Sequence, residues 1–206
     1  MSLKHLTVAA LLAVCTFVPH VSAQTKNEVA GLLGRTFISD QGIRGVTFFD
    51  NNVHFGSGLT FEANYARRVL GAGIASISVE VPFVFNWDEE LRSDAVQIPK
   101  SLKMYFLTPS ARLNIFSDSA VSPWVSFGGG FGHFSEGSTR SGVPSNSGTT
   151  TGALQAGVGL DVRVFGNFSV RGEARDFWSG VPQLNVDTGK SRQHNYFVAG
   201  GIVWHF

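Results

Sequence analysis

The chain has 206 residues, of which 43% are hydrophobic and only 15% are charged, and its formal net charge is +1. So balanced a charge excludes the basic surface that nucleic-acid binding requires. Twenty-four glycines and eighteen phenylalanines, beside so few charges, are typical neither of a disordered chain nor of an ordinary helical protein.

The start of the chain has the anatomy of a secretory signal peptide. One positive charge precedes an apolar run over Leu6–Val18, and small residues lead up to Ala23, after which we expect cleavage. The apolar run is too short for a membrane-spanning helix. Because the only cysteine, Cys15, lies in this segment, the exported chain would have no disulfide. The sequence therefore predicts a signal peptide over residues 1–23 and one domain over residues 24–206.

Eight extended segments follow, and helical spacing is hard to find among them. They are Glu28–Phe37, His54–Arg68, Ile74–Phe85, Lys103–Phe116, Trp124–Phe134, Thr151–Phe165, Phe168–Trp178 and His194–Phe206. The number is even, and most segments are near or above the length that a tilted strand needs to cross a bilayer.

The connections between these segments alternate strictly between short and long. The short ones read "VLGAG", "SDSAVS" and "GN"; the long ones read "ISDQGIRGVTFFDNN", "NWDEELRSDAVQIP", "SEGSTRSGVPSNSGTT" and "SGVPQLNVDTGKSRQ". An outer-membrane barrel places short turns on the periplasmic side and long loops outside, which is the pattern found here.

Each strand also alternates an apolar with a polar face, as Phe168–Trp178 illustrates. Ser169, Arg171, Glu173 and Arg175 share one face of this segment, and the residues between them are apolar or small. Polar faces that combine glycine, hydroxyls and both signs of charge suit the narrow interior of an eight-stranded barrel. A soluble, lipocalin-like carrier would need the opposite arrangement, with an apolar interior and a polar exterior.

Charged residues recur on the faces predicted to point inward. They are Glu62, Glu80, Arg112, Asp161, Arg163, Arg171, Glu173 and Arg175. Buried charges must be paired, so we expect an ion-pair network that fills the lumen. The alternative is a narrow pore for small solutes whose selectivity these charges set, but eight strands leave little room for a channel.

The last segment, "VAGGIVWHF", carries the sharpest local pattern. One face presents Tyr196, Val198, Ile202, Trp204 and Phe206, and the chain stops on the phenylalanine. With this strand and its architecture, the chain resembles the small eight-stranded outer-membrane β-barrels of the OmpA and OmpX type. The resemblance implies that these five residues form the signal read by the barrel-assembly machinery.

One segment raises an enzymatic alternative. His133 and Ser135 share a face near the predicted outer rim, with Glu136 beside them, and this pair resembles the lipid A deacylase family. A hydroxyl nucleophile needs a base within hydrogen-bond reach and a third group to orient that base. Glu136 points to the opposite face if the strand continues, and other parts of the family's pattern are missing. We expect no catalytic residues and no metal site here.

The expected fold class is all-β, an eight-stranded antiparallel transmembrane β-barrel with short periplasmic turns and long extracellular loops. We expect a non-enzymatic, monomeric barrel of the cell outer membrane with a structural or loop-mediated role and no cofactor. Its expected partners are outer-membrane lipid, lipopolysaccharide and, during biogenesis, the assembly machinery, and no nucleic acid.

Overall fold

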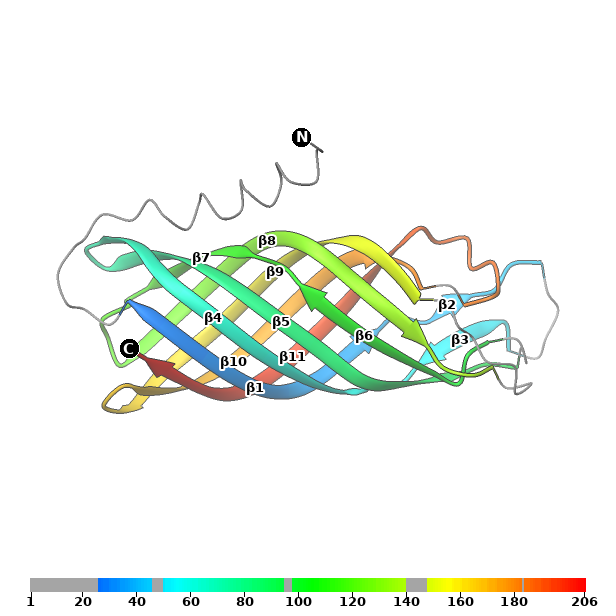
Figure 1. Cartoon of the computed structure of the whole chain (residues 1–206), viewed down its shortest axis with the longest axis horizontal. Coiled ribbons are helices and arrows are strands. Elements are labelled where there is room, and N and C mark those ends of the chain that lie inside the picture. Colours follow the sequence, from blue (N-terminus) through cyan, green and yellow to red (C-terminus); the bar gives the residue numbers. More distant parts are fainter. Residues whose placement is uncertain (1–25, 46–49, 95–97, 140–147, 183) are drawn as a thin grey trace, which may run out of the picture.

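The computed structural model describes residues 26–45, 50–94, 98–139, 148–182 and 184–206, and the regular structure within them is β-strand (Figure 1). The strands are β1 (Asn27–Ile38), β2 (Gln41–Gly42), β3 (Asn52–Phe55), β4 (Leu59–Ala72), β5 (Ala75–Arg92), β6 (Ser101–Leu107), β7 (Ser110–Ile115), β8 (Val121–Glu136), β9 (Gly148–Phe165), β10 (Phe168–Gly180) and β11 (Arg192–His205). A search of these ranges for a helix that could cross a membrane finds none. The predicted signal peptide over residues 1–23 lies outside the described residues.

Eight wall strands close into a barrel. Each of β1, β4, β5, β8, β9, β10 and β11 is one wall strand, and β6 and β7 together form the eighth, between β5 and β8. Antiparallel pairing of β1 with β11 closes the ring, and the backbone N–H groups of Asn27 and Phe206 donate to each other's carbonyl at 3.0 and 2.8 Å. The predicted eight-stranded antiparallel barrel is confirmed.

The predicted fourth segment, Lys103–Phe116, is interrupted in the structure. Pro109 has no N–H to contribute to a ladder, so pairing stops after β6 and resumes at β7. The neighbouring Thr108 N–H reaches only the Pro82 carbonyl, at 3.4 Å. The wall strand is therefore two half-strands.

Several strand ends also differ from the prediction. β3 and β4 are separated by Gly56–Gly58, within the segment predicted to be one strand, and β5 runs on to Arg92 instead of ending at Phe85. These differences gather at the end of the barrel that carries the long connections (Figure 1). Strands there continue beyond the region in which apolar residues alternate, so the sequence pattern that marks them fades.

Short turns and long connections lie at opposite ends of the barrel (Figure 1). The turns after β4 and β9 reverse the chain through Gly73 and Gly166, whose φ angles of 57° and 50° favour glycine. The C-terminal Phe206 lies at this same end, and the hairpin of β2 and β3 extends the opposite one. We call the end with the short turns the inner end and the other the outer end.

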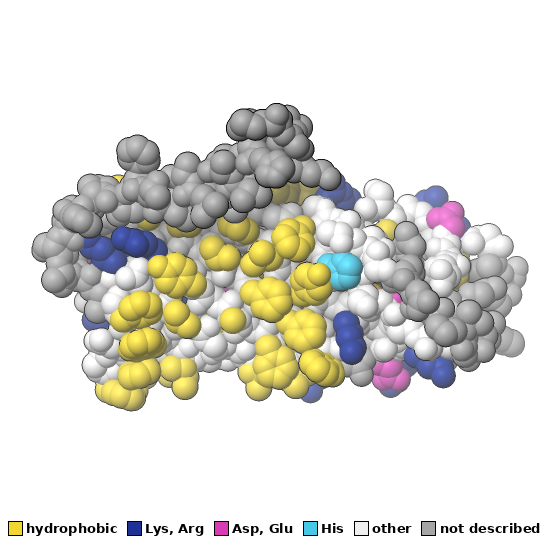
Figure 2. All heavy atoms as spheres, in the orientation of Figure 1, with side chains coloured by type: hydrophobic (Ala, Val, Ile, Leu, Met, Phe, Trp, Pro, Cys, Tyr) yellow, Lys and Arg dark blue, Asp and Glu magenta, His cyan; other side chains and the backbone are white. Residues whose placement is uncertain are grey.

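The exterior of the barrel midsection is apolar. Large hydrophobic side chains project outward from the wall strands, among them Phe127 and Ile202, which are 63% and 61% exposed. Figure 2 shows these side chains spread over the middle of the barrel, while few of them appear on the described part of the outer end. A lipocalin-like carrier would show the reverse, so this alternative does not fit the structure.

The interior has two layers of different character. Toward the inner end lies the ionic layer, defined as Glu28, Glu62, Glu80, Arg112, Asp161, Arg171, Glu173 and Arg175. Toward the outer end lies the apolar layer, defined as Leu102, Met104, Phe106, Phe134, Phe177 and Phe197, each at most 2% exposed.

Toward the outer end the inward faces carry large apolar side chains beside buried polar ones such as Ser179 and Asn195. On β10 the inward face changes from Arg175 to Phe177 in a single step along the alternation. The exterior changes in the opposite sense, to residues such as Arg192 and His194 on β11. Beyond the apolar exterior the strands need an ordinary hydrophobic core, because water would then surround them.

Candidate functional site

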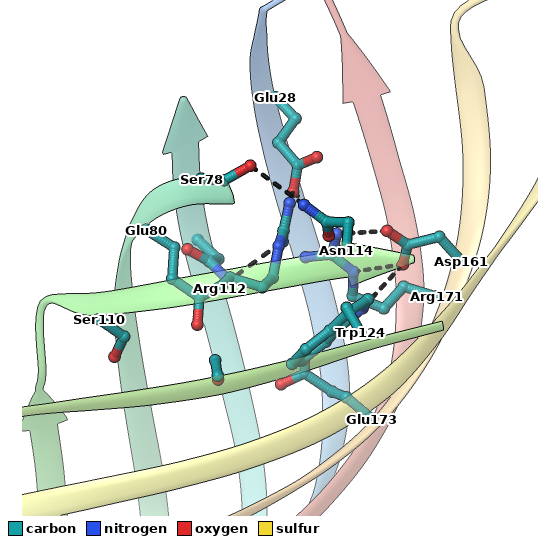
Figure 3. A network of polar contacts seen from close by, with 12 residues as sticks. Glu28, Ser78, Glu80, Ser110, Arg112, Asn114, Trp124, Asp161, Arg171 and Glu173 are labelled. Carbon is teal, nitrogen blue, oxygen red and sulfur yellow. Dashed lines mark hydrogen bonds and ion pairs between the residues drawn. The ribbon is translucent and has the colours of Figure 1, made fainter. Parts of the chain in front are cut away.

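The ionic layer draws its side chains from six wall strands. Glu28 comes from β1, Glu62 from β4, Glu80 from β5, Arg112 from β7, Asp161 from β9, and the remaining three residues from β10. Strand alternation turns all of them inward, so charges that are far apart in sequence converge in one cross-section (Figure 3). The three arginines are at most 2% exposed.

Arg171 and Arg112 share a carboxylate at the inner side of this layer. Arg171 binds Asp161 through two nitrogens, Nε to Oδ1 at 2.6 Å and Nη2 to Oδ2 at 2.7 Å, the planar fork geometry of strong guanidinium pairs. Its Nη2 also lies 2.8 Å from Oε1 of Glu28, and Nη2 of Arg112 lies 2.6 Å from the same oxygen. Glu28 therefore links the two arginines.

Arg175 holds three carboxylates on the outer side of the layer. Its Nε lies 2.6 Å from Glu173 Oε1, its Nη1 2.8 Å from Glu80 Oε1, and its Nη2 3.2 Å from Glu62 Oε1. Glu80 also contacts Arg112 at 3.4 Å, which joins this cluster to the one around Glu28.

One aromatic ring organises the three guanidinium groups. Trp124 projects inward from β8, and the guanidinium carbons of Arg112, Arg171 and Arg175 lie 5.4, 5.2 and 5.2 Å from its ring centroid. Such cation–π contacts favour positive charge over the face of an indole. Gly159, opposite Trp124 on β9, leaves the space into which the ring projects, since a Cβ there would meet the indole.

The structure places the residues that the sequence assigned to the lumen as follows. Seven of the eight lie in the ionic layer: Glu62, Glu80, Arg112, Asp161, Arg171, Glu173 and Arg175. Arg163 does not; it is exposed at the inner mouth, where it lines a cavity of about 260 Å³ with Glu28 and His205, and it has no ion pair in the described part of the chain. Glu28, which completes the layer, was missed.

The enzymatic candidate does not assemble in this structure. His133 and Ser135 lie on the outward face of β8, whereas Glu136 is turned inward and buried. Nδ1 of His133 lies 2.7 Å from the Thr150 hydroxyl, and its ring stacks on Tyr105 with a centroid distance of 5.0 Å. Glu136 is thus on the wrong side of the wall to orient His133.

A histidine at the outer end bridges two carboxylates. Nδ1 of His54 lies 2.6 Å from Asp40 Oδ2 and Nε2 lies 2.7 Å from Asp50 Oδ2. Only a ring with protons on both nitrogens donates to both carboxylates. This clasp ties β3 to the two chain segments that precede it. The hydrogen bonds that His54 donates to Asp50 and then to Asp40 raise the pKa of His54, and the hydrogen bonds that Asp50 accepts from His54 and from the Asn52 N–H lower the pKa of Asp50.

We predict that this clasp is complete only within a pH window. Because the pKa of His54 is raised, its protonated ring stabilises the clasp fully below the ordinary histidine pKa. This contribution is lost as the pH rises through the raised pKa. Because the pKa of Asp50 is lowered, its carboxylate stabilises the clasp fully above the ordinary aspartate pKa. This contribution is lost as the pH falls through the lowered pKa. NMR titration of the His54 ring should show a midpoint above that of the Asp50→Asn variant. Equal midpoints in the two proteins would contradict the clasp.

No protein-family model matches the chain, and no curated protein sequence matches it. Solved structures do. The chain is similar to neisserial surface protein A, with 14% identity, a TM-score of 0.58, and coverage of 87% of this chain and 97% of that one. It is also similar to the outer membrane protein OprG of Pseudomonas aeruginosa, with 10% identity, a TM-score of 0.59, and coverage of 88% and 96%. The chain thus has the fold of the small eight-stranded outer-membrane β-barrels.

Proposed function

We propose that this chain is an integral outer-membrane protein without enzymatic activity, a closed barrel that acts as a scaffold for its long outer loops. The observation that carries the proposal is the apolar exterior of the midsection, where side chains such as Val198 and Ile202 are 52% and 61% exposed. Such a surface is stable only in contact with lipid, and a closed barrel leaves no backbone edge unpaired there.

The last strand supports the same proposal. Tyr196, Val198, Ile202, Trp204 and Phe206 all project outward, between 43% and 61% exposed, from the strand that closes the barrel against β1. We propose that the assembly machinery of the outer membrane reads this face before closure covers its backbone edge. Outer-membrane lipid and lipopolysaccharide are the proposed partners after insertion.

Cell fractionation tests the proposed location. The full chain, expressed in a Gram-negative host, should be recovered with the outer membrane and require detergent for extraction. Recovery in the soluble periplasm without detergent would overturn the proposal.

The packed interior argues against the alternative of a narrow solute pore. Phe106 stacks on Phe177 with a centroid distance of 4.5 Å and an interplanar angle of 12°, and it meets Phe134 edge-on at 5.9 Å. The three rings are at most 2% exposed and occupy the lumen between the ionic layer and the outer loops. The interior of an eight-stranded barrel is just wide enough to be filled by side chains, and these rings fill it here.

We predict that the purified, refolded barrel is silent in planar lipid bilayers. No stepwise conductance should appear, because the ion-paired side chains of the ionic layer fill the lumen and the packed rings of the apolar layer lie above them. The pore alternative predicts unitary steps whose ion selectivity shifts in Arg171→Gln or Glu173→Gln. Observation of such steps would contradict the proposed scaffold role and indicate a channel.

A further inference from the structure

Two basic side chains that have no carboxylate partner among the described residues lie close in sequence at the outer boundary of the apolar exterior. Lys190 precedes β11, Arg192 begins it, and His194 follows at the next outward position; all three are exposed. We call these three residues the cationic stripe. Directly below them on the same face lie Tyr196 and Val198, which belong to the apolar exterior.

The charges of Lys190 and Arg192 are not neutralised within the described part of the chain. Nζ of Lys190 contacts only the backbone oxygen of Asp40, at 3.4 Å, since the Asp40 carboxylate is held by His54. The Arg192 guanidinium lies over the Trp178 ring at 5.2 Å and has no ion pair with any described residue. By contrast, Arg92 at the same end is paired with Glu90 at 2.9 Å.

An aromatic ladder lies beneath and holds the stripe in position. The His194 ring stacks between Tyr196, at a centroid distance of 5.7 Å, and Trp178, at 6.4 Å. Nδ1 of His194 lies 2.7 Å from Asp176 Oδ2, and this carboxylate on β10 faces Tyr196 across the strand pair. The Asp176 carboxylate thus pairs with His194 and not with Lys190 or Arg192, which lie farther toward the outer end.

We propose that the cationic stripe binds the phosphate groups of a phosphorylated glycolipid of the outer leaflet, lipid A. A guanidinium fork and an ammonium group are both suited to phosphate oxygens, and the two lie on either side of β11, toward Trp178 and toward Asp40. Trp178 and Tyr196 are amphipathic rings of the kind that lie at the headgroup level. Acyl chains of the same molecule would lie along Val198 and Ile202 below. The proposal rests on the proposed membrane location and specifies one lipid-binding face, on β10 and β11.

The test compares charge removal at the two ends of the barrel. Lys190→Gln/Arg192→Gln removes two charges from the stripe, and Arg67→Gln/Arg163→Gln removes two exposed charges from the inner end. Native mass spectrometry of the detergent-refolded full barrel would measure adducts with diphosphorylated lipid A and with lipid A from which both phosphates have been removed. Inorganic phosphate in excess serves as the competitor.

The stripe variant should bind diphosphorylated lipid A roughly twentyfold more weakly than the unchanged barrel and the inner-end variant. The dephosphorylated lipid should bind weakly and equally to all three, and inorganic phosphate should not displace the lipid. Equal binding of the two double variants would overturn the proposal, as would displacement by phosphate alone, which would indicate a site for a free anion. A barrel that does not refold into detergent or bilayers at all would instead overturn the proposed function.

Discussion

Replacing Arg175 by methionine is expected to lower the free energy of unfolding by about 3–5 kcal/mol, the usual cost of removing one partner from a buried ion pair. Arg175 is the common partner of Glu62, Glu80 and Glu173, and the side chains of all four residues are fully buried. Methionine fills most of the space but leaves Glu62 and Glu173 without their cation and Glu80 with only its 3.4 Å contact to Arg112. Reversible urea unfolding of the barrel in lipid vesicles, followed by tryptophan fluorescence, would measure the change.

The matched control for this variant is Arg163→Met. Arg163 has the same side chain and also comes from a wall strand, but it is exposed at the inner mouth and has no ion pair among the described residues. Its replacement should change the free energy of unfolding by about 0.5 kcal/mol or less. If the two variants lost the same stability, the ionic layer would not be the source of the effect.

Replacing Gly201 by valine is expected to prevent closure of the barrel. Gly201 lies opposite Leu32 where β11 pairs with β1, and its inward side is in close contact with the backbone. A Cβ at this position would run into the carbonyl oxygen of Gly31 and the Cα of Leu32. Backbone atoms in a hydrogen-bonded ladder cannot move aside, so the seam between first and last strands would have to open. We expect the heat-modified electrophoretic mobility of the folded barrel to be lost.

The adjacent residue provides the control for this second prediction. Gly200 lies on the outward face of the same strand, where a Cβ would meet no atom closer than the Arg171 carbonyl oxygen at 3.6 Å. Gly200→Val should therefore fold and show the shifted mobility of the unchanged protein. A folded Gly201→Val barrel, or failure of both variants, would contradict the close packing at the seam.

The layered interior bears on what the barrel does. An ionic layer alone would be compatible with a gated pore, since its charges line the lumen. The apolar layer above it, with loop residues such as Ile98 and Leu184 packed onto it, closes the outer end. The cationic stripe is exposed at that end, and the proposed interactions are assigned to it and to the long connections.

The sequence pattern found most of the ionic layer because alternation is local. On β10, the residues Arg171, Glu173 and Arg175 occupy every second position, and one strand is enough to put them on one face. Glu28 was missed because the other residues on the inward face of β1, such as Ala30 and Leu32, are apolar, so this strand shows no alternation of polar residues. Arg163 was placed on the correct face but too far into the barrel, because the pattern does not show where a wall strand leaves the interior.

The sequence by itself determined the number of wall strands, the apolar exterior, and the separation of short turns from long loops. Each of these follows from a period of two residues and from turn composition, which are properties of neighbouring residues. Only the tertiary structure decided that Arg175 meets Glu80, that Trp124 lies beneath three guanidinium groups, and that stacked aromatic rings fill the lumen toward the outer end. Those contacts cross the lumen between strands far apart in sequence, and they depend on strand tilt and register around the closed ring, which no single strand encodes.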